Sequence, residues 1–250
     1  MRNNSTKYFQ YTTVFIALTL PSITNAEDSL KLGLLTGGET TIYKGVDEEI
    51  SAFPLISARY GMFFFQGLQG GVSFFEDKDY NLDLFVTYSG QGYDASDSSV
   101  FYGMEDRDGA VEAGFSTSYR IGFGEIDFGF AHDVSGIYEG FHTQLNCNIP
   151  LMRGERFMLR SSFGVEWLSE DMVAYYYGVK SSEATSDRSA YSPGSTINAN
   201  VSLMSIVSLS ENWALRMRVE YELLGEEISE SPLVEKDYRA SAGIGVIYSF

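Results

Sequence analysis

The last thirteen residues of the chain, 238–250, alternate between two kinds of side chain, and few folds allow such a pattern. Every second residue from Tyr238 to Phe250 is apolar or aromatic, and those between them are small or polar except for Ile247. A period of two is typical of a β-strand whose two faces meet different surroundings. Strands of this kind that stop on an aromatic residue are typical of bacterial outer-membrane barrels, which have lipid outside and a polar interior. The pattern therefore predicts an all-β, transmembrane antiparallel β-barrel.

The first 26 residues have the composition of a secretory signal peptide. Arg2 and Lys7 give a basic start, an apolar run covers 11–20, and small residues precede an expected cleavage site between Ala26 and Glu27. No other run approaches the roughly 18–20 apolar residues that a transmembrane helix needs. A membrane-embedded form of this chain must therefore be a closed barrel, which pairs its backbone amides without water.

The composition suits one barrel that spans residues 27–250. The chain contains 17 Tyr, 18 Phe and 25 Gly, yet its mean hydropathy is only −0.10. Such neutrality is unusual for a helical membrane protein and normal for a barrel, because only alternate residues of each strand meet lipid. We therefore expect one domain in the outer membrane of a Gram-negative bacterium.

The charge of the chain excludes one class of partner. The formal net charge is −17, and it becomes −19 without residues 1–26, which contain two basic residues and no acidic one. This excess of acid argues against nucleic acid as a ligand, because phosphates demand a basic surface. It suits a surface that meets outer-membrane lipid and lipopolysaccharide with its bridging divalent cations, although a solvated acidic face is the simpler interpretation.

The single cysteine, Cys147, excludes an intramolecular disulfide and a cysteine metal cluster. Its place in the alternation predicts that it faces lipid as a small apolar side chain.

The same alternation recurs along the chain and predicts twelve strands. They are expected near 30–37, 50–60, 62–68, 71–76, 80–90, 110–121, 124–133, 140–149, 155–167, 196–208, 212–223 and 238–250. Long connections then share one end of the barrel, at 38–49, 91–109, 168–195 and 224–237. Short turns share the other end, at 60–61, 77–79, 122, 150–154 and 210–211. Long outer loops and short periplasmic turns are typical of outer-membrane barrels.

Two alternatives to twelve strands stay open. The segment 62–76 is the weakest, because Gly70 and Gly71 must form a tight outer turn within it, and ten strands is the second possibility. A soluble β-sandwich would show the same periodicity. The signal peptide, the terminal aromatic residue and the charged inner face favour the barrel.

Six charged residues are expected on the inner face of the barrel. They are Arg156, Arg160, Arg216, Arg218, Glu220 and Glu222. In a narrow barrel such residues pair across strands and fill the interior. In a wider one they would set the selectivity of a channel for small solutes, which is the alternative function.

Catalytic, cofactor and metal sites are not expected. His132, Asp133 and His142 flank a turn where a metal site is conceivable, but a fourth ligand is missing. His142 would face Ser162 if the 150–154 turn were symmetric, yet no group is clearly placed to orient the imidazole as a hydrolase needs. We therefore expect the protein not to be an enzyme.

Two groups of aromatic residues are further candidates for a functional role. Tyr175, Tyr176 and Tyr177 could stack on a sugar or another ligand, but aromatic residues beside a barrel rim more often lie in the interfacial girdle. Tyr248 and Phe250 are expected to form the recognition signal for barrel insertion.

An ordered series of short motifs lies between residues 175 and 233, within a resemblance that runs over essentially all of residues 27–250. It consists of Tyr175-Tyr176-Tyr177-Gly178-Val179, then Pro193-Gly194, then Trp213, then Ser231-Pro232-Leu233. With this series the chain resembles the MipA/OmpV family of outer-membrane proteins. The founding member is described as a scaffold that joins a murein lytic transglycosylase to a peptidoglycan synthase. The resemblance implies a non-enzymatic barrel that maintains the envelope or supports peptidoglycan turnover through contacts with such partners.

Overall fold

The computed structural model of the protein describes residues 28–48 and 50–250. The expected signal peptide and its cleavage site between Ala26 and Glu27 lie outside the described residues.

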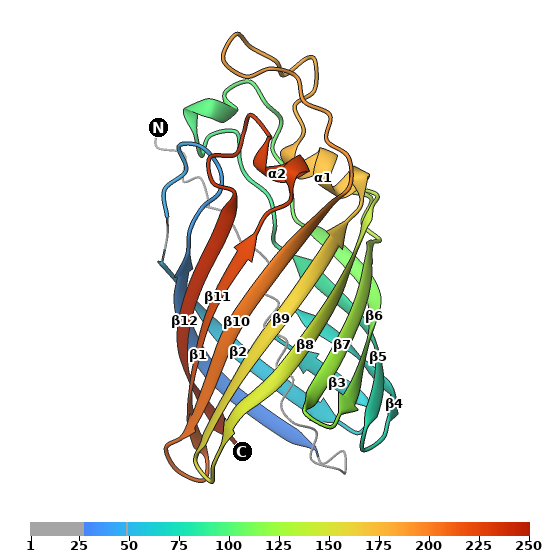
Figure 1. The fold of residues 1–250 in the computed structure, drawn as a ribbon, viewed down its shortest axis with the longest axis vertical. Coiled ribbons are helices and arrows are strands. Elements are labelled where there is room, and N and C mark those ends of the chain that lie inside the picture. Colours follow the sequence, from blue (N-terminus) through green and yellow to red (C-terminus); the bar gives the residue numbers. More distant parts are fainter. Residues whose placement is uncertain (1–27, 49) are drawn as a thin grey trace, which may run out of the picture.

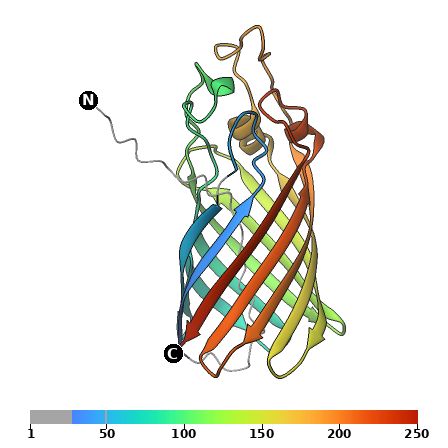
Figure 2. The same ribbon diagram turned by 90° about the vertical axis from the view of Figure 1, so that its left-hand side faces the viewer.

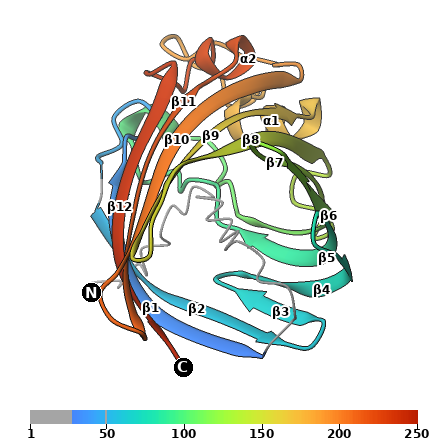
Figure 3. The same cartoon turned by 60° about the horizontal axis from the view of Figure 1, so that its bottom comes forward.

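In residues 28–48 and 50–250, twelve antiparallel strands form a closed barrel, so the expected fold and strand number are confirmed. In chain order they are β1 (Ser29–Glu39), β2 (Ile50–Tyr60), β3 (Phe63–Gln66), β4 (Gln69–Glu76), β5 (Tyr80–Ser89), β6 (Ala110–Ile121), β7 (Gly124–Asp133), β8 (Phe141–Arg153), β9 (Phe157–Leu168), β10 (Thr196–Ser208), β11 (Trp213–Leu223) and β12 (Tyr238–Ser249). Each strand pairs with its neighbours in sequence, and β1 also pairs with β12. Figure 3 shows the resulting ring of strands.

The two ends of the barrel differ in the length of their connections (Figure 1). Short turns and the C-terminus lie at one end, which we call the inner end. Long loops gather at the other, the outer end, and hold α1 (Glu170–Tyr177), α2 (Glu226–Ser229) and a short 3₁₀ helix, η1 (Ser99–Phe101). Among residues 28–48 and 50–250, no helix is long and apolar enough to cross a membrane.

The alternation of side chains places apolar residues outside and polar residues inside, as expected. On β11, Val219 and Tyr221 are exposed on the outer wall, whereas Glu222 is buried on the inner wall. The exposed apolar side chains of the wall meet lipid, because a barrel in a membrane shows the bilayer an apolar band.

Small residues permit closure where β1 meets β12. A Cβ atom at Gly33 would lie 2.5 Å from the carbonyl oxygen of Val246, and one at Gly37 would lie 2.6 Å from that of Ala242. The first and last strands can approach closely because these positions lack side chains. Beyond the paired strands, the N–H of Phe250 donates to the carbonyl oxygen of Leu30, at 3.0 Å.

Two short connections differ from expectation. The turn between β3 and β4 is made by Gly67 and Leu68 rather than by Gly70 and Gly71, and Gly67 has a φ of 61°, which favours glycine. Strand β8 does not end before Pro150 but continues to Arg153. Its register shifts between Pro150 and Met152, which is a β-bulge, and a bulge accommodates proline in a sheet.

A charge introduced by mutation on either face of one strand tests which face meets the lipid. On β10, Val201 is exposed on the lipid-facing wall and Asn200 is its neighbour on the inner wall. Val201→Arg is expected to lower the free energy of unfolding from lipid vesicles by about 2–4 kcal/mol, because the charge enters the bilayer. Asn200→Arg is the matched control, and we expect it to lower the free energy of unfolding by clearly less. Equal losses in a urea titration would contradict this orientation of β10.

Candidate functional site in the outer cap and the barrel interior

Five outer loops pack into one folded unit, which we call the outer cap. It consists of residues 40–48, 90–109, 134–140, 169–195 and 224–237. Each loop contributes buried apolar side chains to a common core: Tyr43, Phe101, Tyr138, Tyr176 and Leu233 come from the five loops in turn. Figure 2 shows these loops above the strands, with α1 among them. The loops therefore form a core of the kind found in soluble proteins.

Helix α1 connects opposite sides of this cap. Tyr176 is 0% exposed, and its ring centroid lies 5.8 Å from that of Tyr138, in the loop between β7 and β8. The Tyr177 ring stacks at 5.9 Å on Tyr43, in the loop between β1 and β2. Because these two loops lie across the barrel from one another, α1 and its neighbours span the outer mouth.

The interpretation of the three tyrosines as girdle residues or as a ligand platform is wrong. Tyr176 and Tyr177 are buried in the cap core, and burial raises the pKa of both hydroxyls. Tyr175 is partly buried at the edge of this core, where its hydroxyl accepts the backbone N–H of Asp108 at 2.9 Å. The run of tyrosines stabilises the cap and does not face lipid.

A buried ion pair, the Arg107–Glu183 clamp, joins two cap loops. Its nitrogen and oxygen lie 3.0 Å apart, and the two side chains are 3% and 4% exposed. Arg107 Nε also donates to the carbonyl oxygen of Tyr175 at 2.7 Å. Burial alone would raise the pKa of Glu183, but backbone N–H groups of Glu105 and Lys180 and the Arg107 guanidinium lower it overall. The clamp therefore holds the loop 90–109 against the loop 169–195.

Most motif residues of the sequence converge in the cap. The Ser231 hydroxyl donates to the carbonyl oxygen of Tyr177 at 2.6 Å, and the Gly194 N–H donates to the Glu227 carboxylate at 2.8 Å. Leu233 is fully buried beside them. The motif residues in the cap are Tyr175, Tyr176, Tyr177, Gly178, Val179, Pro193, Gly194, Ser231, Pro232 and Leu233. They lie in the loop 169–195 and in the last outer loop, which these hydrogen bonds join.

Beneath the cap, His142 lies between two carboxylates on the inner wall. Its Nε2 is 3.2 Å from Glu112 Oε2, and its Nδ1 is 3.0 Å from Glu166 Oε1. Tyr138 of the cap donates its hydroxyl to the other Glu112 oxygen at 2.8 Å. This cluster joins the cap to three strands, and sequence reasoning missed it because its members are distant in sequence.

The register does not bring His142 and Ser162 opposite each other. His142 lies opposite Leu168 in the register of β8 and β9, whereas Ser162 lies opposite Asn148. Both imidazole nitrogens already contact carboxylates. Neither nitrogen is therefore free to take a proton from a serine, which a hydrolase of this class requires.

The side chains of His132 and Asp133 beside the 134–139 turn make hydrogen bonds to the backbone. The Asp133 carboxylate accepts four backbone N–H groups of this turn and so organises the loop. His132 points its Nδ1 at the carbonyl oxygen of Asp133, 2.6 Å away. Within the described parts of the chain, no three His, Cys, Asp or Glu side chains are grouped to hold a metal ion.

Five of the six charged residues expected inside lie on the inner wall. They are Arg160, Arg216, Arg218, Glu220 and Glu222. The expectation for Arg156 is wrong, because this residue lies exposed in the turn before β9 begins at Phe157.

Two arginines of the inner wall, Arg218 and Arg239, form ion pairs with carboxylates of that wall. Arg218 Nε donates to the Glu220 carboxylate at 3.0 Å, and Arg239 donates to Glu222 at 3.0 Å. Arg239 belongs to the alternating set of β12, so the same periodicity could have added it to the expected group. Arg216 is 3% exposed, and its two terminal nitrogens have no hydrogen-bond partner among the described residues.

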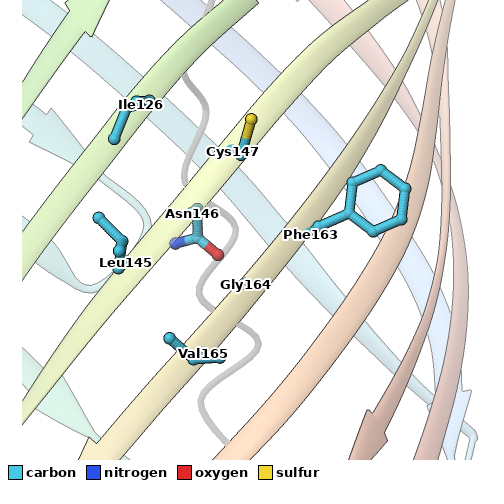
Figure 4. A pocket seen from close by; sticks show the side chains of 7 residues that line it. All are labelled: Ile126, Leu145, Asn146, Cys147, Phe163, Gly164 and Val165. Carbon is cyan, nitrogen blue, oxygen red and sulfur yellow. The ribbon is translucent and has the colours of Figure 1, made fainter.

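The outer wall contains a shallow hollow of about 270 Å³ between β7, β8 and β9 (Figure 4). Its lining includes Ile126, Leu145, Phe163 and Val165, and Cys147 lies among them as a partly exposed apolar group. These side chains belong to the lipid-facing set of their strands. The hollow is therefore filled by lipid in the membrane and is not a site for a soluble ligand.

The inner end exposes apolar side chains at its short turns, and we call this surface the inner rim. Met62, Phe123 and Leu209 are 49%, 64% and 55% exposed and lie in three different turns. Nearby, Trp213 contacts Tyr248 edge to face, with ring centroids 4.9 Å apart. Trp213 is thus the one motif residue that lies at the inner end.

Comparison with known proteins identifies the family. A family model described as "MltA-interacting protein MipA" matches residues 32–250 of the chain. The chain belongs to the MipA family. It is an outer-membrane β-barrel protein of that family, as the resemblance in its motifs implied.

Several MipA relatives are named as outer-membrane proteins. The outer membrane protein OmpV of Vibrio cholerae is 29% identical over 170 residues, which are 68% of this chain and 66% of OmpV, slightly less than two thirds of that relative. The MltA-interacting protein of Escherichia coli is 26% identical and aligns over 93% of this chain and 94% of its own. Among solved structures, Pseudomonas putida OprB has a TM-score of 0.47 at 9% identity, with 90% of this chain and 94% of OprB covered.

Removal of the clamp carboxylate tests the stability of the cap. Glu183→Gln is expected to cost about 3 kcal/mol of cap stability, because it leaves the Arg107 charge buried without its partner. Limited proteolysis of the outer loops should become about a hundredfold faster while the strands stay protected. The control is Glu105→Gln, in an exposed pair with Lys180 that contributes little. Unchanged proteolysis of Glu183→Gln would contradict the role of the clamp.

The cap is also expected to loosen in acid. The pKa of Glu183 is lowered in the folded cap, whereas an unfolded glutamate has a pKa of about 4.3. The clamp therefore stabilises the cap fully above this unfolded value and loses its contribution as the pH falls through the folded pKa. Near-ultraviolet circular dichroism of the cap tyrosines between pH 7 and pH 2 should show this loss. The difference between the wild type and Glu183→Gln should vanish at the acidic end.

Proposed function

We propose that this MipA-family barrel is a non-enzymatic scaffold that holds a murein-processing enzyme at the periplasmic face of the outer membrane. The observation that carries this proposal is the contrast between the two ends. The outer mouth is spanned by a folded cap with a buried core, whereas the inner rim exposes Met62, Phe123 and Leu209. The name of the Escherichia coli relative, an MltA-interacting protein, supports the same class of partner.

The partner is expected to contact several turns of the inner rim together. Each turn is short, and a standard interface needs roughly 800 Å² from each partner. No single turn offers such an area, so the contact must cover the rim and the adjoining edge of the barrel. Peptidoglycan lies on the periplasmic side, so this is also the end that a lytic transglycosylase or a peptidoglycan synthase can reach. The outer loops contain many more acidic than basic residues, so the outer end is left for lipopolysaccharide and its divalent cations.

Cross-linking in native envelopes tests the scaffold. A tagged copy should recover a lytic transglycosylase or a peptidoglycan synthase well above the level obtained with an unrelated barrel. The triple variant Met62→Ser, Phe123→Ser and Leu209→Ser is expected to lose at least nine tenths of this recovery, because exposed apolar anchors dominate interface energies.

A matched triple variant at the outer end is the control. Ile50→Ser, Tyr102→Ser and Val134→Ser change exposed apolar residues near the cap and should leave recovery unchanged. Recovery of only lipopolysaccharide and the insertion machinery would contradict the scaffold. Equal loss in both triple variants would contradict the inner rim as its docking surface.

A narrow channel for small solutes is the second candidate, and the charged inner wall favours it. Arg216, Arg218 and Glu220 lie where they would set ion selectivity. Planar bilayers distinguish the two functions. Unit conductance whose ion preference reverses in Arg216→Glu would favour the channel, and silent bilayers would favour the scaffold.

A further inference from the structure

The guanidinium of Arg216 is buried in the wall of the barrel interior without a carboxylate to neutralise it. The side chain is 3% exposed, and neither Nη1 nor Nη2 has a hydrogen-bond partner among the described residues. The described charged groups within electrostatic reach are Arg218 and Arg160, which carry the same sign. A buried charge that lacks a counter-charge and hydrogen bonds is strongly unfavourable. An anion at this position would remove the penalty.

The neighbouring arginines differ from Arg216 because acidic residues accompany them. Arg218 donates to Glu220, and Arg160 lies within electrostatic reach of Asp127 and Glu125 on β7. The register places Arg160 and Arg218 on either side of Met204, since both pair with that residue of β10. Positive charge is thus concentrated on β9 and β11. Of these three arginines, Arg216 is the one without an acidic neighbour.

The surroundings of Arg216 are apolar, which strengthens any ionic contact made there. Its cross-strand neighbours are Ile206 on β10 and Gly245 on β12. Ile247, two residues beyond Gly245, is buried on the same inner face. The Leu35 side chain lies over Gly245, where a Cβ atom would collide with it. In a site of low polarity with few competing donors, the attraction between a guanidinium and an anion is stronger than in water.

We propose that the interior of the barrel near its inner end binds a small oxyanion, a carboxylate or phosphate group, through the guanidinium of Arg216. The planar fork of an arginine side chain matches two oxygens of either group. Arg218 and Arg160 lie beside the site and attract the anion electrostatically. The site is distinct from the inner rim, so the cross-linking result does not decide it.

Inorganic phosphate is the probe for this site. The purified full-length barrel in detergent micelles is heated while sodium phosphate replaces sodium chloride at constant ionic strength. The wild-type melting temperature is expected to rise with phosphate and to saturate, because ligand binding to the folded state stabilises it. Sodium acetate in the same series tests the carboxylate. A saturating rise with either anion supports the site, and the absence of a rise with both overturns it.

Two substitutions of Arg216 locate the effect. Arg216→Met keeps an apolar stem of similar length and removes the charge, so the phosphate response should disappear. Its melting temperature in chloride should not fall, because an uncompensated buried charge has been removed. Arg216→Lys keeps the charge without the fork and should weaken apparent phosphate affinity about tenfold. Heat-modifiable mobility in electrophoresis shows that both variants form the barrel.

The matched control is Arg59→Gln on β2. Arg59 already pairs with Glu76 at 2.6 Å, so its loss should leave the phosphate response unchanged. A response that survives in Arg216→Met, or that disappears equally in Arg59→Gln, would show a general salt effect and overturn the proposal. A lower melting temperature of Arg216→Met in chloride would also overturn it, since Arg216 would then be satisfied within the protein.

Discussion

The closed ring of backbone hydrogen bonds is the constraint on which the rest of the structure depends. In a bilayer, each unpaired N–H or C=O group costs several kcal/mol, so an open edge strand is not tolerated. The pairing of β1 with β12 removes both edges at once. This pairing requires the close approach that Gly33 and Gly37 permit. Once the ring is closed, every side chain of the membrane-spanning strands must face either the lipid or the interior.

Periodicity therefore predicted most of the barrel, and its errors occur where the pairing is irregular. The strand pattern of β11 and β12 could be recognised because lipid on one side forces an apolar residue at every second position. The bulge after Pro150 could not be recognised, since a shift of register leaves the composition of a strand unchanged. The β3–β4 turn was misplaced because Gly67, Gly70 and Gly71 are close together in sequence, and of these three only Gly67 has a positive φ.

The cap follows different rules, which explains why its core was not predicted. Above the membrane, water satisfies exposed backbone groups, and packing among distant loops replaces the period of two. Tyr176 contacts Tyr138 and Tyr43 from loops far away in sequence, and no local pattern contains that information. The family resemblance found the right residues in the tyrosine run. Their burial, and the clamp between Arg107 and Glu183, emerged only from the folded loops.

In the barrel interior, the sequence pattern also could not predict which charged residues form ion pairs. The alternation of side chains places both Arg216 and Arg218 on the inner wall, because they are two residues apart on one strand. Their energetic situations differ, since Arg218 has Glu220 beside it and Arg216 lies between Ile206 and Gly245. A strand pattern fixes which side a charge faces but not which charge it meets. Interior charges that have partners stabilise the wall, and one without a partner is better explained by a ligand than by the fold.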